Sequence, residues 1–162
     1  MSLMIDWVSV VLSIPHATPI NNGNVVSIDV DGEIEWKTDK RLSVEGSYGS
    51  SIQIRSEGQE GEGLYTKIRL DGNLVKWWQG HNVFGSDDLL GLITATLCSI
   101  LPRVAPDIRL SDEIISLYVL CARLTRVDVN GMYDLGNEHR VMTWLRAAQD
   151  SANLRHRGRG QF

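Results

Sequence analysis

Residues Leu64–Leu101 read LYTKIRLDGNLVKWWQGHNVFGSDDLLGLITATLCSIL, and this stretch decides the fold because it contains both kinds of regular element. Its first half alternates apolar and polar residues around Asp71-Gly72, which predicts a strand, a two-residue turn and a second strand that ends at Trp78. Its second half predicts a helix over Ser86–Leu101, with Ser86 as N-cap, acidic residues in the first turn and Pro102 as the stop. Strands and helix therefore lie within one short segment.

The flanking segments add mainly strands. Residues 5–14 (IDWVSVVLSI) form a β-branched apolar run typical of a central strand, and residues 25–36 (VVSIDVDGEIEW) predict a hairpin around Asp31-Gly32. Ser51–Arg55 predicts a short strand, followed by a glycine- and glutamate-rich loop. Further on, Ala122–Val129 alternates as a strand does.

A second helix is predicted over Asn137–Asn153, where apolar residues recur at helical spacing. The order of elements predicts an α+β fold with a mostly antiparallel sheet and two main helices packed on one face. We expect a single domain over residues 4–154, preceded by an artificial extension at 1–3 and followed by a basic tail at 155–162 that begins a further C-terminal segment.

Composition limits the classes of function. The chain has 162 residues, 43% of them hydrophobic, and a net charge of −4, which argues against a histone-like DNA binder. No apolar run is long enough to span a membrane and no signal-peptide pattern opens the chain, so we expect a soluble, intracellular protein without a membrane partner.

Gly80-His81-Asn82 is the first candidate site, because it connects a predicted strand to the capped helix. The structural interpretation is a connection that needs glycine conformations and uses His81 and Asn82 for backbone hydrogen bonds. The functional interpretation places His81 in a cleft as a metal ligand or acid–base group, beside a helix N-terminus that receives a metal-bridged phosphate.

The tryptophan pair Trp77-Trp78 is the second candidate. On a strand the two indoles face opposite sides, so only one of them can be core, and the other could stack on an unpaired base. Burial is the more common fate of an indole.

The third candidate is the strand LTRVDVNG, residues 124–131. Arg126, Asp128 and Asn130 share one face of it, whereas Thr125, Val127 and Val129 share the other and can be core. The polar face is either a solvated ion pair followed by a turn, or a divalent-metal site with Asp128 as ligand and Arg126 holding that carboxylate or a phosphate.

The last candidate is the basic C-terminus. Its three arginines alternate with His and Gly, which favours contact with a nucleic-acid backbone, although a frayed terminus is an equally good interpretation. The residues concerned are Arg155, Arg157 and Arg159.

Two motifs, QGHNVFGSDDL (79–89) and LTRVDVNGMY (124–133), resemble those of the replication initiators of filamentous phages, rolling-circle nickases of the CRI type. The match runs from Met4 to Phe162 and corresponds to the N-terminal portion of such an initiator. The resemblance implies an HUH (His-hydrophobe-His) endonuclease-like, ferredoxin- or RRM-like fold. It also implies a divalent metal that polarises the scissile phosphate, and a tyrosine that nicks the origin and later rejoins the displaced strand.

The resemblance also implies a set of site residues. His81, Asp128 and Asn130 would be the metal ligands, and Arg126, Trp77, Trp78, Asn82 and the three tail arginines would contact single-stranded or hairpin origin DNA. No His-hydrophobe-His motif is present, so this oxygen-rich set suits Mg²⁺ or Mn²⁺ better than Zn²⁺. The nucleophilic tyrosine is expected beyond residue 162, so we expect this chain to bind the origin without nicking it.

Two functions stay open at this point, and a third, a ferredoxin-like domain with an unrelated small-ligand site, gains only if the resemblance is mistaken. The chain is either this DNA- and metal-binding initiator domain, or a non-catalytic regulator that binds the origin or another protein; the acidic segment from Asp29 to Glu62 would suit a protein partner. The resemblance further suggests host replication proteins as partners, a homodimer on the origin and action in the cytoplasm of a bacterial host.

Overall fold

The computed structural model describes residues 2–60, 63–151, 153–154 and 158–159, and the chain divides into two compact units. One unit covers Leu3–Asn130, and the other contains the residues from Gly131 onward. The expectation of one domain over 4–154 stays a prediction.

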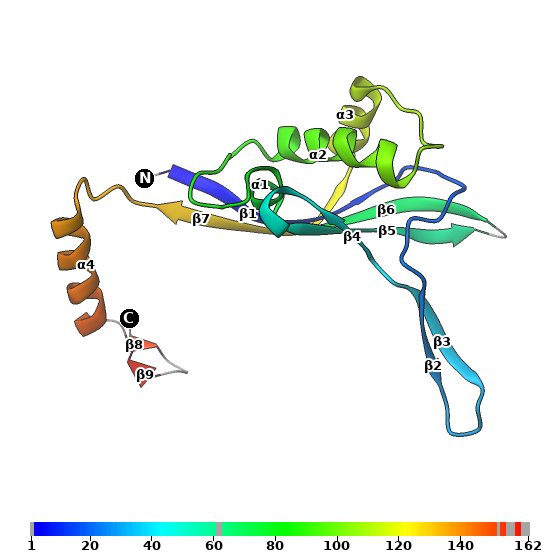
Figure 1. Ribbon diagram of the computed structural model, residues 1–162, viewed down its shortest axis with the longest axis horizontal. Coiled ribbons are helices and arrows are strands. Elements are labelled where there is room, and N and C mark those ends of the chain that lie inside the picture. The colour runs from blue at the N-terminus through cyan, green and yellow to red at the C-terminus, as the bar shows by residue number, and fades with distance from the viewer. Residues whose placement is uncertain (1, 61–62, 152, 155–157, 160–162) are drawn as a thin grey trace. The chain divides into compact units, whose positions relative to one another are not determined.

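The first unit is built on a five-stranded sheet with the order β4-β5-β6-β1-β7, so the predicted α+β class is confirmed (Figure 1). Neighbouring strands pair antiparallel, with Leu70 of β6 opposite Val10 of β1 on one side and opposite Ile54 of β5 on the other. The strands are β1 (Ser2–Leu12), β4 (Leu42–Glu45), β5 (Ser51–Glu60), β6 (Leu64–Gly72) and β7 (Arg123–Met132).

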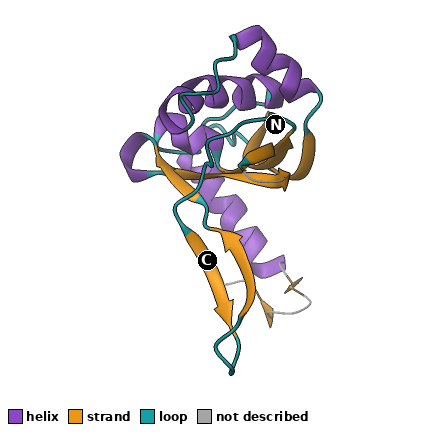
Figure 2. Ribbon diagram, turned by 90° about the vertical axis from the view of Figure 1, so that its right-hand side faces the viewer, coloured by secondary structure: helices purple, strands orange, loops and turns teal. Residues whose placement is uncertain are grey.

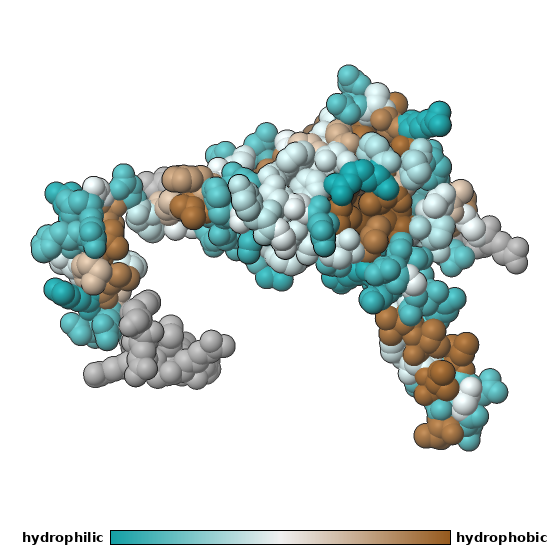
Figure 3. Space-filling model, viewed as in Figure 1, coloured by the Kyte–Doolittle hydropathy of each residue, from teal (hydrophilic) through white to brown (hydrophobic). Residues whose placement is uncertain are grey.

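The hairpin predicted at 25–36 is confirmed as β2 (Asn24–Ile28) and β3 (Ile34–Asp39), which pair only with each other within the described ranges. Apolar side chains cover much of its surface (Figure 3). Ile28, Ile34 and Trp36 are each at least half exposed, so the hairpin presents apolar surface outside the core.

Three helices cover one face of the sheet, and the β2–β3 hairpin leaves from the other side (Figures 1 and 2). We call this other side, which these three helices leave uncovered, the helix-free face. The helices are α1 (Leu74–Gln79), α2 (Leu89–Val104) and α3 (Asp112–Leu120), and a short 3-10 turn, η1 (Ser47–Gly49), precedes β5.

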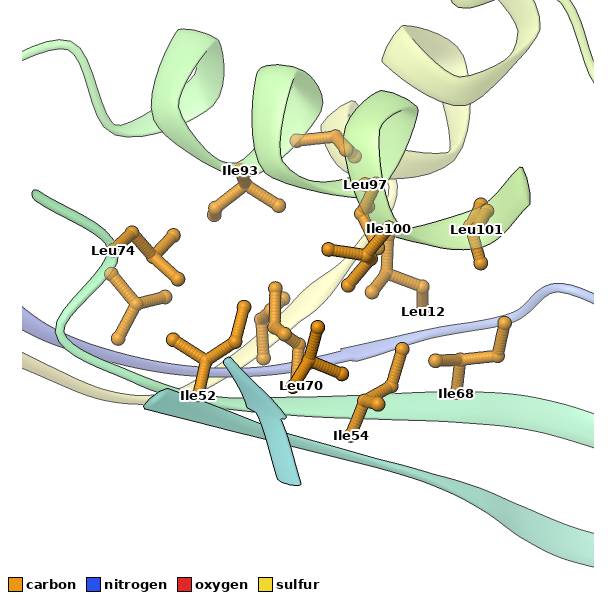
Figure 4. Packing of buried hydrophobic residues seen from close by; sticks show 14 of the residues in the cluster. Leu12, Ile52, Ile54, Ile68, Leu70, Leu74, Ile93, Leu97, Ile100 and Leu101 are labelled. Atoms are coloured by element: carbon orange, nitrogen blue, oxygen red, sulfur yellow. The ribbon is translucent and has the colours of Figure 1, made fainter. Parts of the chain in front are cut away.

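The core lies between α2 and the sheet (Figure 4). Side chains alternate along a strand, so the even-numbered residues of β5 and β6 point to α2, whereas the odd-numbered residues point to the helix-free face. The fully buried side chains between the two layers include Leu12, Ile52, Ile54, Ile68, Leu70, Ile93, Leu97 and Ile100.

The prediction of a second strand that ends at Trp78 is wrong, because residues 74–79 form helix α1. Asp71 and Gly72 are not a turn but the last two residues of β6, where they pair with β1. The helix is set by its ends: the Asn73 side chain accepts from Lys76 N at 2.8 Å, and Gly80 closes it in the left-handed conformation.

The boundaries of the other elements also differ. Helix α2 begins at Leu89 with Asp88 as N-cap, and it continues past Pro102 to Val104, so the proline does not stop it. Helix α3 was not predicted. Strand β5 extends to Glu60 because the glycine- and glutamate-rich segment pairs with β6 instead of forming a loop.

Strand β7 is confirmed, but the expectation that Thr125, Val127 and Val129 can be core is wrong, since all three are exposed at the edge of the sheet. In the second unit, α4 (Glu138–Ser151) confirms the helix predicted over 137–153, and β8 (Asn153–Leu154) pairs with β9 (Gly158–Arg159). Within the described residues, no helix has the length and apolar character needed to cross a membrane.

Candidate metal and nucleic-acid site

The loop that carries His81 is held closed by the residue before it. The Gln79 side-chain amide donates to the carbonyl oxygens of His81, at 3.3 Å, and of Phe84. Gly80 has a φ of 80°, and a Cβ there would overlap Cδ2 of Tyr48, so only glycine fits. The loop is therefore a defined structure that presents an exposed imidazole, whose ring meets Phe84 edge-on.

Asp6 of β1 ties this loop to the sheet. One of its oxygens, Oδ1, accepts from Asn73 Nδ2 at 2.7 Å and from Asn82 Nδ2 at 3.0 Å. A backbone hydrogen bond of 3.0 Å from Ile5 N to Ser86 O fixes the far end of the loop to the same strand. The carboxylate of Asp6 therefore joins the start of α1, the His81 loop and β1.

Strand β7 lies beside this point. It neighbours β1 and runs in the opposite direction (Figure 1). Thr125 Oγ1 donates to Ser9 O at 3.1 Å, and the Arg126 guanidinium lies 5.5 Å from the centre of the Trp7 ring. These contacts place Thr125 and Arg126 of β7 beside Ser9 and Trp7 of β1.

Asp128 is bound by its neighbour on the same strand. Arg126 donates to both carboxylate oxygens, from Nε to Oδ1 at 2.9 Å and from Nη2 to Oδ2. The hydrogen bond from Arg126 lowers the pKa of Asp128, and the same bond raises the pKa of Arg126. Both groups are accessible to solvent, so this pair adds little to stability but keeps the carboxylate ionised.

The three proposed metal ligands lie on these adjoining elements without forming a closed cage. His81 and Asn130 are exposed, and Asp128 is engaged by Arg126. Among the described residues, no group of three or more His, Cys, Asp or Glu side chains is arranged to hold a metal ion. The donor chemistry of imidazole, carboxylate and amide fits Mg²⁺ or Mn²⁺, but the present geometry would need Asp128 to exchange its partner.

The residues proposed to contact DNA differ in how far their side chains are exposed to solvent. Trp77 is 4% exposed and its indole Nε1 donates to Val44 O at 3.0 Å, so it has no free face for stacking. Trp78 is 44% exposed, Asn82 and Arg126 are exposed, and these three stay candidates. Arg155 and Arg157 lie outside the described residues, and Arg159 is described only as part of the backbone of β9.

Sequence reasoning missed a charged network on the helix-free face. Arg55 and Arg69 are direct cross-strand partners on β5 and β6, and both donate to Glu57 Oε1, at 2.7 Å and 2.6 Å. Burial raises the pKa of Glu57, but hydrogen bonds from Arg55 and Arg69 outweigh burial and lower it overall. In the sequence, Arg55 and Glu57 lie two residues apart, and so do Arg69 and Asp71. This spacing on two paired strands could have indicated the charged network.

Asp71 continues this network toward the centre of the sheet. Its side chain is buried, and its oxygens lie 3.7 Å from Arg69 Nη1 and 3.5 Å from Arg41 Nη1. Oδ2 makes no hydrogen bond within the described residues, so a long ion pair is its main compensation. Arg69 also reaches Thr125 of β7 at 3.4 Å, which links β6 to β7 across the face.

Replacing Asp6 by alanine should loosen the His81 loop, because two amides lose their common acceptor. We expect a loss of about 1–3 kcal/mol in the free energy of unfolding and faster amide hydrogen exchange over residues 80–86. Urea denaturation and hydrogen exchange measure both. Asp87→Ala is the matched control, since the Asp87 side chain is exposed in the same region; equal effects of the two substitutions would contradict the role of Asp6.

Comparison with known proteins adds a family relationship. A family model that describes the N-terminal part of a phage replication-associated protein matches residues 4–162. The chain is 41% identical over 155 residues to a replication-associated protein of Enterobacteria phage I2-2, an alignment that covers 94% of this chain and 44% of that relative. The chain thus spans less than half the length of this relative. No solved structure matches the chain at a significant level.

Proposed function

The chain belongs to the family formed by the N-terminal region of a phage replication-associated protein, and on that premise we propose that it binds origin DNA and a divalent metal. In the full-length initiator this region would serve origin-specific strand nicking and rejoining. Its DNA partner would be single-stranded or hairpin origin DNA in the cytoplasm of the host. Host replication proteins and a second copy of the chain are further proposed partners.

One observation supports the site above the others: Asp6 of β1 accepts a hydrogen bond from Asn82 of the His81 loop, and β1 is also the neighbour of β7, the strand that carries Asp128. The three proposed ligands therefore come from a loop and a strand that both contact β1. His81, Asp128 and Asn130 would hold Mg²⁺ or Mn²⁺, which would polarise a phosphate when bound.

The chain's own residues would do the rest. Arg126 is placed to keep Asp128 ionised and, once Asp128 turns to the metal, to pair with a phosphate oxygen. Trp78 offers the indole face on which an unpaired base would stack. Tyr65 is not a suitable nucleophile, because burial and the adjacent Asp39 carboxylate raise its pKa and keep its hydroxyl protonated.

Asp128→Ala tests the metal site directly. We expect Mn²⁺ binding, measured by titration calorimetry or electron paramagnetic resonance, to weaken by more than the roughly 10–100-fold that outer-shell partners contribute to metal affinity. The fold should be intact, because Asp128 is solvent-accessible and contributes little to packing.

Asp31→Ala is the control for this experiment, since it removes an exposed carboxylate from the β2–β3 connection and leaves the net charge equal to that of Asp128→Ala. Unchanged Mn²⁺ affinity in Asp128→Ala would mean that the ligand assignment is wrong.

A protein-binding regulator is the second proposed function, and the exposed hairpin favours it. Ile28, Ile34 and Trp36 present apolar surface next to several carboxylates, a composition suited to a protein partner and unsuited to DNA. Binding of a hairpin oligonucleotide that needs no metal and collapses with rising salt would favour this alternative.

A further inference from the structure

A polar groove lies where the β2–β3 hairpin leaves the helix-free face. Its volume is about 730 Å³, within the range of small-ligand sites in proteins. It is lined by residues of β5, by Tyr65 of β6 and by residues of the hairpin. The lining side chains that matter for its chemistry are Asn24, Lys37 and Thr38 from the hairpin and Arg55, Glu57 and Gln59 from β5.

The two carboxylates of the groove are already engaged. Glu57 Oε1 accepts from Arg55 and Arg69. Burial raises the pKa of Tyr65, and the Asp39 carboxylate lies near enough to the Tyr65 hydroxyl to raise that pKa further. These interactions reduce the negative charge that a ligand would meet. The groove is consequently less repulsive to a phosphate than its composition suggests.

Several other lining groups have no partner among the residues that the structure describes. Within the described part of the chain, the side-chain amides of Asn24 and Gln59 make no hydrogen bond, and the Lys37 ammonium makes no ion pair. Each amide offers a donor and an acceptor, and Lys37 offers an unpaired positive charge. The free groups are therefore those that bind a base edge and a neighbouring phosphate.

The groove is continuous with the charged network described above, because Arg55 and Glu57 belong to both. From there the network passes through Arg69 to Asp71 and Thr125. A strand lying across the helix-free face would thus meet arginines along its path and the amides of the groove at one end.

We propose that this hairpin groove binds one nucleotide of a DNA single strand, with Asn24 and Gln59 reading the base edge and Lys37 pairing with the adjacent phosphate. The proposal rests on the proposed DNA-binding function and adds a base-selective site to it. It assigns the hairpin a role in sequence preference, separate from the metal ligands of the His81 region.

The test is fluorescence anisotropy of the 162-residue chain with labelled single strands of oligo-dA, oligo-dC and oligo-dT over a salt series. The wild-type chain should bind the three strands with different affinities. The double variant Asn24→Ala/Gln59→Ala should reduce the ratio of the strongest to the weakest affinity about tenfold, the loss typical of one bidentate base contact. Lys37→Gln should weaken all strands alike and reduce the salt slope by about one.

Gln53→Ala is the matched control, because Gln53 is also an amide of β5 on the helix-free face but lies outside the groove. It should leave the ranking unchanged. A ranking unaffected by the double variant, or shifted equally by Gln53→Ala, would overturn the groove assignment alone. If wild type binds none of the three strands, this inference fails, whereas the proposed binding of origin DNA and metal is decided separately by the hairpin oligonucleotide and by Mn²⁺ titration.

Discussion

Trp77→Ala should be the most damaging of the tryptophan substitutions, with an expected loss of about 3–5 kcal/mol in the free energy of unfolding. The indole is 4% exposed, packs edge-on against Trp78 and fills the space beside Gly46, where even a Cβ would overlap the indole ring. Removing it leaves a cavity and deprives the Val44 carbonyl of its donor. A urea denaturation series with a constant m-value measures the change.

Two further variants identify the cause of that loss. Trp77→Phe keeps most of the ring volume and loses the hydrogen bond, so it should cost clearly less than Trp77→Ala. Trp78→Ala should cost only about 1 kcal/mol, because Trp78 is 44% exposed and donates a single hydrogen bond to Thr96. A Trp78→Ala loss equal to that of Trp77→Ala would contradict this division between a core and a surface indole.

The Trp78→Ala variant also bears on function. Since it should stay folded, its affinity for single-stranded DNA can be compared with wild type. A stacked base is worth about 1–3 kcal/mol, so binding should weaken by at least severalfold if Trp78 is the stacking platform.

Gly72→Ala should destabilise the protein by about 2–4 kcal/mol, since the added methyl group would enter the core. Its Cβ would lie 2.6 Å from Cγ2 and 3.2 Å from Cα of Ile52, a residue with no exposed surface. The φ of 155° adds strain for any residue with a side chain. Thermal and urea unfolding both measure the effect.

Gly23→Ala is the matched control for Gly72→Ala. Gly23 also has a positive φ, of 85°, but nothing lies within 4 Å of the position that a Cβ would take there. The control should lose only about 1 kcal/mol, the cost of a left-handed conformation. If the two variants are equally stable, the overlap with Ile52 is not the reason for glycine at position 72.

The sequence predicted the sheet better than the helices, for physical reasons that particular residues illustrate. The β-branched apolar run at residues 5–14 and the alternation at 25–36 and 122–129 indicate a pleated sheet directly, and all three segments lie in strands or a hairpin. Leu74–Gln79 contains two indoles and a valine, which favour strands, but the capping by Asn73 and Gly80 and the burial of Trp77 outweigh that preference. Tertiary packing therefore sets the helical structure of this segment, which its local propensity does not predict.

The site residues stay a prediction. The resemblance to phage initiators singled out the Gln79–Gly85 block and the Arg126–Asp128 strand, and in the structure both segments contact the N-terminal half of β1. Asp6 could not be assigned, because its role depends on two amides that are 67 and 76 residues away along the chain. The groove beside β5 also escaped prediction, since it exists only where the hairpin turns away from the sheet.

Strand β7 ends the sheet on one side, and this position affects how the protein behaves at high concentration. An edge of 10 residues presents a row of backbone groups that other chains can extend by β-pairing, whereas β4 at the opposite edge has only 4 residues. The exposed apolar side chains of Leu124, Val127 and Val129 would favour such stacking. Arg123, Arg126 and Asp128 interrupt them and act as gatekeepers against aggregation, so these charges protect solubility as well as any site they form.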